Sequence, residues 1–149
     1  MQNRNSSVEQ QYRILTVVWF VLLFSQIMFL AVIYFSKPEV FKFDFSKSPF
    51  GENPVFVVSF AFLAVVNLIV SFVIKKRCVE QAIAEQKIQY VQTGLIIGCA
   101  LCEAISLLGM VLAFTVSYQY FFLWFLLGIT GIILHFPKRD AVIAASYKK

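Results

Sequence analysis

The chain has 149 residues, of which 60% are hydrophobic and 14% are charged, and its formal net charge is +5. A chain this short with a mean hydropathy of +0.78 cannot bury its apolar groups in a soluble globule, so lipid must act as part of its solvent. This excludes a soluble enzyme or binding module. No basic run is interleaved with aromatic residues as a single-strand binder requires, so no nucleic-acid partner is expected.

Four apolar segments follow one another along the chain, at 14–35, 55–74, 91–116 and 118–136. Each approaches the length that crosses a hydrocarbon layer of about 30 Å as a helix. Because lipid offers no partner to a free backbone N–H or C=O, each span is expected to be helical. The sequence therefore predicts an all-α fold, a four-helix transmembrane bundle.

The first span, 14–35, is expected to be permanent. Its apolar run exceeds the roughly 7–15 residues of a cleaved signal peptide, and no small-residue cleavage site follows it. The next segment, 36–54, contains Phe41-Lys-Phe-Asp-Phe45, in which rings alternate with charges. This pattern fits a strand that docks on a partner, or, as we prefer, a loop whose rings dip into the headgroup layer.

The remaining connections are a segment at 75–90, a short turn at 117–120 and a tail at 137–149. The 75–90 connector lacks proline and glycine and is expected to be helical. Ten of the 13 basic residues lie in 1–13, 75–90 and 137–149, and the other three, in 36–54, are matched by acids. The positive-inside rule then predicts that both termini and the 75–90 connector are cytoplasmic, with the 36–54 loop and the 117–120 turn outside.

Glu103 is the single charged residue in 91–116. Counting along the helix places it about 15–18 Å deep, where an ionised carboxylate costs about 3 kcal/mol, so burial favours the neutral acid. Its candidate partners are Gln26 at similar depth in the first span, Ser106 one turn away and Asn67 in the second span. Two interpretations stay open: a structural clip to Gln26, which we prefer, and a proton or cation site.

Small residues indicate helix-packing faces. They recur four apart or nearly so in the third span and again in the fourth, where they permit close helix approach; they are Gly94, Gly98, Cys102, Gly109, Gly128 and Gly131. Cys99 and Cys102 have redox spacing but lie in an apolar segment, so both are expected to pack. The single histidine, His135, is expected at the interface without metal partners. We predict no catalytic residue, metal or cofactor, and no enzyme.

The segment Ala100-Leu-Cys-Glu-Ala-Ile-Ser-Leu-Leu-Gly-Met-Val-Leu-Ala-Phe114 resembles the ion-carrying helix of the rotary ATP synthase c subunit. That resemblance implies that Glu103 is a proton- or sodium-binding carboxylate. The whole chain resembles a bacterial family of small four-span membrane proteins, in its Ala-Leu-Cys-Glu-Ala-Ile helix and in Leu134-His-Phe-Pro137. This second resemblance implies a bacterial inner-membrane location and a four-span architecture, and it implies no particular chemistry.

The function expected from the sequence is that of a packing, accessory or scaffold component of the membrane. Its partners would be the lipid bilayer and either further copies of itself or a larger membrane complex. The alternative is a proteolipid or small transporter that binds a proton or cation at Glu103.

Overall fold

The computed structural model describes residues 2–42, 44, 48–51 and 53–146, with side chains described from residue 8 onward. The prediction of an all-helical fold is confirmed, since no strand occurs among these residues. The elements in chain order are α1 (Gln2–Ser36), η1 (Pro38–Phe41), α2 (Pro54–Glu85), α3 (Gln89–Val116), η2 (Gln119–Phe121), α4 (Phe122–Leu134) and α5 (Arg139–Ser146).

Three helices are long and apolar enough to cross a membrane: α1 from Val8 onward, α2 and α3. A fourth span exists if residues 119–134 and α5 count as one segment bent by 45°. These three to four long apolar helices indicate a multi-pass membrane protein, because their exposed apolar side chains need a lipid solvent.

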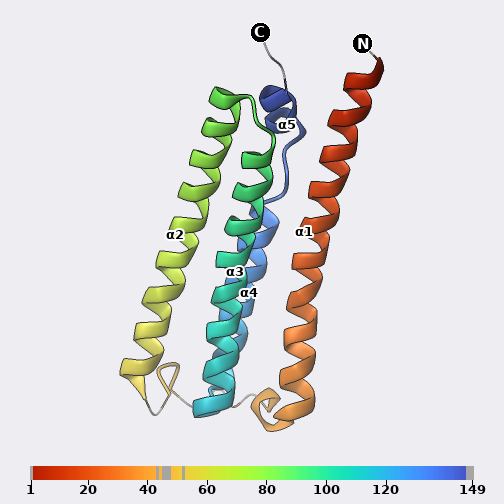
Figure 1. Ribbon diagram of the computed structural model, residues 1–149. Helices are drawn as coiled ribbons and strands as arrows, with labels where there is room; N and C mark the ends of the chain where they lie inside the picture. The colour runs from red at the N-terminus through yellow and green to blue at the C-terminus, as the bar shows by residue number, and fades with distance from the viewer. Residues whose placement is uncertain (1, 43, 45–47, 52, 147–149) are drawn as a thin grey trace.

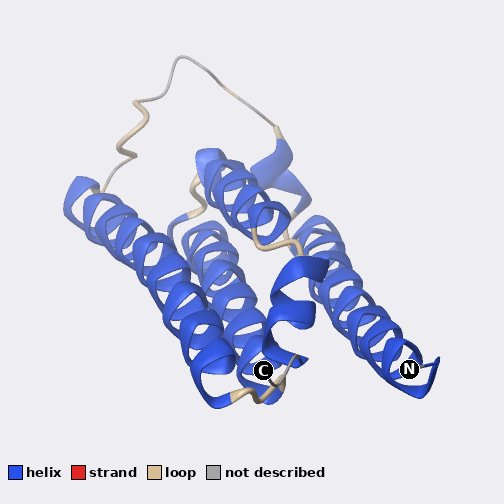
Figure 2. Cartoon of the chain, turned by 90° about the horizontal axis from the view of Figure 1, so that it is seen from above, coloured by secondary structure: helices blue, strands red, loops and turns tan. Residues whose placement is uncertain are grey.

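The helices run side by side, with α3 at the centre in contact with α1, α2 and α4. Helices α1 and α2 lie on opposite sides of it (Figures 1 and 2). The start of α1, the turn at 86–88 and α5 lie at one end, which we call the terminal end (Figure 1). The described residues between α1 and α2 and the short η2 lie at the other end, which we call the loop end.

The core consists of two groups of buried side chains. One group, towards the loop end, includes Ile33, Val57 and Phe121. The other, towards the terminal end, includes Leu15, Trp19, Leu95 and Ile132. Both groups draw on α1, α2, α3 and the α4 region, so each half of the bundle has a core to which all four elements contribute.

Several boundaries differ from the sequence expectation. The segment expected as one helix over 118–136 begins with the short η2, and α4 itself has 13 residues. The tail at 137–149 contains α5, which is held by the buried side chains of Val142 and Ala145. In the loop, residues 38–41 form η1, and the Phe41 ring packs edge-on against Phe121 at 5.3 Å. Phe43 and Phe45 of the alternating motif lie outside the described residues.

Candidate functional site

Glu103 lies on α3 where that helix faces α1, and its side chain is half-buried. Its Oε1 is hydrogen-bonded to the hydroxyl of Ser25 on α1. The same hydroxyl lies 2.7 Å from the carbonyl oxygen of Leu22, one turn back on α1. The Glu103 carboxyl group is therefore joined to α1 through the Ser25 hydroxyl, which also lies within hydrogen-bond distance of the Leu22 carbonyl oxygen.

The sequence predicted Gln26 as the hydrogen-bond partner of Glu103, and this prediction is wrong. The partner is the preceding residue, Ser25. Consecutive helical residues point about 100° apart, so Ser25 and Gln26 face different neighbours. Gln26 belongs to the buried stripe of α1 that also carries Trp19 and Ile33, seven residues to either side. Its side chain is 0% exposed, and neither Oε1 nor Nε2 has a hydrogen-bond partner.

Ser106 and Asn67 are likewise not joined to Glu103. Ser106 is fully buried, its hydroxyl has no hydrogen-bond partner, and it lies against Gly128 of α4. Asn67 is half-buried on α2, which packs on the side of α3 away from α1. The four polar residues therefore belong to different helix contacts, and only Glu103 has its hydrogen bond to another span.

The small residues lie where helices approach most closely. A Cβ added at Gly94 would lie 2.7 Å from Cys78 Cβ of α2, and one at Gly109 would lie 2.6 Å from Trp124 Cβ of α4. At Gly131 it would lie 2.6 Å from Cys102 Sγ. Real Cβ atoms do not approach so closely, so any larger residue there would push the backbones apart.

The cysteines take part in the same packing. Cys99 and Cys102 are fully buried, and both are free thiols. Cys102 Sγ lies 3.7 Å from the Ser71 hydroxyl of α2, a long thiol hydrogen bond. Both belong to the buried cluster towards the terminal end.

His135 is fully buried within the protein. Its expected position at the membrane interface stays a prediction. It caps the C-terminus of α4 with its ring folded back, so that Nδ1 lies 2.7 Å from the Gly131 carbonyl oxygen. The ring packs 4.5 Å from that of Phe72 and fills the space beside Gly98. Among the described residues no group of three or more His, Cys, Asp or Glu side chains could hold a metal.

Two contributors to the α1 interface escaped the sequence analysis. Ser25 is a single serine in an apolar run, which by itself does not indicate a site. Only its position next to Gln26, at the depth of Glu103, could have identified it as a partner. Trp19 donates its indole N–H to the Ile132 carbonyl oxygen of α4 at 2.7 Å, within a buried contact. Together these bonds join α1 to both α3 and α4.

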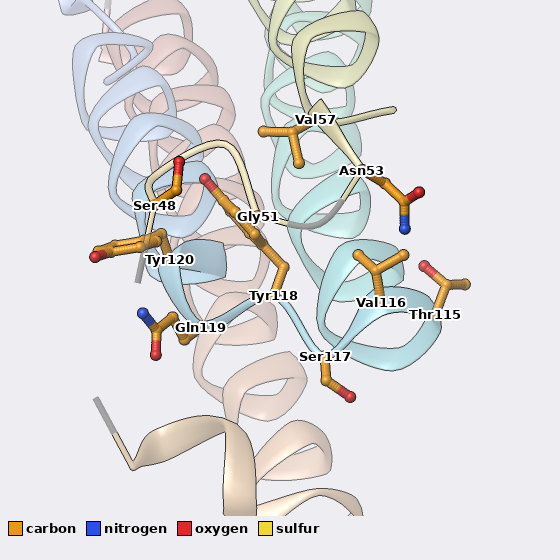
Figure 3. A pocket seen from close by; sticks show the side chains of 10 residues that line it. All are labelled: Ser48, Gly51, Asn53, Val57, Thr115, Val116, Ser117, Tyr118, Gln119 and Tyr120. Atoms are coloured by element: carbon orange, nitrogen blue, oxygen red, sulfur yellow. The ribbon is translucent and has the colours of Figure 1, made fainter. Parts of the chain in front are cut away.

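A pocket of about 430 Å³ lies at the loop end (Figure 3). Its lining residues on α3, Thr115 and Val116, follow Glu103 by three helical turns or more. The loop before α2, the last turn of α3 and the turn after it line the pocket, including Ser48, Asn53, Thr115 and Tyr118. The Tyr118 hydroxyl donates to the Pro49 carbonyl oxygen at 2.5 Å, so the turn holds the loop in place. Nothing in the sequence pattern indicated this pocket.

Comparison of the chain with protein-family models, with curated protein sequences and with solved structures gives no match.

Proposed function

We propose that this protein is a four-span packing or accessory component of the bacterial inner membrane, in which Glu103 acts as a clip between spans. The observation that carries the proposal is the hydrogen bond between Glu103 of α3 and Ser25 of α1. Helices in lipid gain little from burying apolar surface against one another, so interhelical polar contacts and close packing hold them together.

The neutral form of Glu103 accounts for both contacts of the Ser25 hydroxyl. A serine hydroxyl has one hydrogen to donate and two lone pairs that accept. When that hydrogen goes to the Leu22 carbonyl oxygen, a protonated Glu103 supplies its own hydrogen to Ser25 Oγ. A neutral acid also avoids the cost of an ionised carboxylate deep in the bilayer.

The proposed topology places both termini in the cytoplasm. In the structure the start of α1, the 86–88 turn and α5 share one end (Figure 1). The described segments at that end carry eight of the 13 basic residues, namely Arg4, Arg13, Lys75, Lys76, Arg77, Lys87, Lys138 and Arg139. The positive-inside rule assigns such an end to the cytoplasm. Accessibility labelling of single cysteines at Lys42 and Lys76 in intact cells tests this: the loop-end position should react with an impermeant maleimide and the other should not.

The clip is tested by a double-mutant cycle on the full-length protein in detergent. We expect Ser25→Ala and Glu103→Ala to be coupled by about 0.6–1.7 kcal/mol in the free energy of unfolding, the range for interhelical bonds in membranes. The matched control is Ser59→Ala on α2, whose hydroxyl bonds to its own helix at Val55. Coupling between Ser25 and Glu103 no larger than that between Ser59 and Glu103 contradicts the clip.

The second candidate function is proton or cation binding at Glu103, and Gln26 favours it. This buried amide has no hydrogen-bond partner and lies one residue from Ser25, at the depth of Glu103. Because the amide faces a different neighbour from Ser25, cation binding would need α1 to turn until the amide oxygen joins the Ser25 hydroxyl and the Glu103 carboxylate as a ligand. Labelling of Glu103 by dicyclohexylcarbodiimide that sodium slows, and that Glu103→Gln abolishes, would favour this function over the clip.

A further inference from the structure

A groove of about 390 Å³ opens at the terminal end, between α1, α2, α3 and the segment joining α4 to α5. Its volume falls within the range of about 300–1,000 Å³ usual for small-ligand sites. Apolar side chains from four helices line it; they include Leu15, Phe72, Leu95 and Leu134. It lies apart from Glu103 and from the loop-end pocket.

Three lysines share the lining of this groove: Lys75, Lys76 and Lys138. Lys76 lies 3.9 Å from Glu80, so its charge is partly matched. Within the described part of the chain, Lys75 and Lys138 have no carboxylate at ion-pair distance. Both line the same groove, so their like charges repel each other. An anion between these two ammonium groups would relieve that repulsion.

The charged and apolar parts of the groove lie at different membrane depths. Lys75 directly follows the apolar run at 55–74, and Lys138 follows the end of α4 by four residues. Both therefore lie at the level of lipid headgroups, whereas Phe72 and Leu134 belong to the apolar runs themselves. A phospholipid has the same division, with a charged phosphate above an acyl chain.

We propose that this groove binds one anionic phospholipid. Lys75 and Lys138 hold the phosphate, and an acyl chain lies along Leu134 and the neighbouring apolar side chains. Basic pockets between membrane helices at the headgroup level are suited to anionic lipids. A free phosphate ion would use the lysines alone and leave the apolar walls facing water. The proposal requires membrane insertion and does not depend on the role of Glu103.

Native mass spectrometry of the full-length protein tests the site. The protein is released from micelles that contain equal amounts of phosphatidylglycerol and phosphatidylcholine, and the retained lipid is counted. We expect phosphatidylglycerol to be preferred. We expect K75Q combined with K138Q to reduce that preference about 25-fold, because each basic residue near the headgroups contributes a factor of about five.

Two matched controls make the outcome specific. K42Q combined with R77Q removes the same charge from exposed positions outside the groove and should keep the preference. Leu134→Ala should weaken retention of phosphatidylglycerol about threefold, whereas Leu126→Ala should not. Both leucines are on α4 and each is 61% exposed, but only Leu134 lines the groove.

Several results would overturn the proposal. One is an unchanged preference in the K75Q and K138Q protein, and another is an equal loss in the K42Q and R77Q protein. Displacement of the lipid by millimolar inorganic phosphate would assign the lysines to a free anion. Equal retention by the two leucine variants would exclude an acyl chain, and it decides the question even if the lysine variant fails to fold. A protein dimer appearing in place of the lipid adduct would assign the groove to a second copy.

Discussion

Helices α2 and α3 are comparably apolar but occupy different places in the bundle. In the most apolar 18-residue window of each, 17% of α2 is buried and 44% of α3 is buried. This difference in burial parallels the glycine content of the two helices: α3 carries three glycines and α2 carries none. Lipid tails are as apolar as leucine, so hydrophobicity does not select the central helix of a membrane bundle; the capacity for close approach does.

The largest effect is expected at Gly128, where α4 packs on α3. A Cβ there would lie 2.8 Å from the backbone carbonyl oxygen of Cys102, which cannot rotate away. We expect Gly128→Val to lower the free energy of unfolding by about 3 kcal/mol, the upper part of the usual range for overpacking. Chemical denaturation in detergent, followed by circular dichroism, measures this change.

Val65 on the lipid-facing side of α2 supplies the control. Its side chain is 51% exposed, so Val65→Leu adds volume where lipid can yield. We expect a change within about 0.5 kcal/mol, as for other surface substitutions. Equal losses at Gly128 and Val65 would mean that glycine content does not explain why α3 is central.

A smaller effect is expected at Gly98, where the obstruction is a side chain. A Cβ there would lie 2.5 Å from His135 Cδ2 and 2.8 Å from Nε2. We expect Gly98→Ala to lower the free energy of unfolding by about 2 kcal/mol. In a His135→Ala background the same change should cost less than about 1 kcal/mol, since the obstructing ring is gone. An equal cost in both backgrounds would show that backbone contact, not the ring, sets the helix spacing there.

Much of the architecture could be predicted because lipid solvation constrains it strongly. The apolar runs and the helical state follow from composition alone, and α1, α2 and α3 extend past the predicted ends of their apolar runs as helix. Helix ends that depend on local packing were less predictable. The η2 turn and the buried positions Val142 and Ala145 of α5 depend on contacts with distant segments, which no local pattern encodes.

The sequence predicted the level along the helices at which the candidate site lies, but not which side chain of α1 points towards α3. Counting residues places Glu103 and the Ser25–Gln26 pair at one level, yet a shift of one residue rotates a side chain by about 100°. The choice of Ser25 over Gln26 depends on how α1 turns towards α3, and Trp19 and its bond to Ile132 help to fix that rotation. The burial of His135 was likewise not predictable, because its ring folds back over the last turn of α4.

The smallest effect concerns the loop end, where α3 ends and α2 begins. Tyr118, 5% exposed, donates to the Pro49 carbonyl oxygen and so links the segments that flank these two helices. Burial, with a smaller contribution from Tyr120, raises the pKa of Tyr118 above the usual tyrosine value of about 10. The stabilisation is then complete below about pH 10 and is lost as the pH rises through the raised pKa, because the unfolded state ionises first.

Tyr118→Phe should lower the free energy of unfolding by about 1 kcal/mol at neutral pH, as for one hydrogen bond. The difference between the wild-type and variant proteins should shrink above pH 10, since the wild type alone loses this stabilisation on ionisation. Tyr90→Phe at the terminal end is the control, because Tyr90 bonds to the exposed Glu85 rather than across the loop end. A difference that stays constant to pH 12 would show that the Tyr118 hydroxyl does not link the ends of α2 and α3. The asymmetry between the two helices would then depend on the glycine contacts of α3 alone.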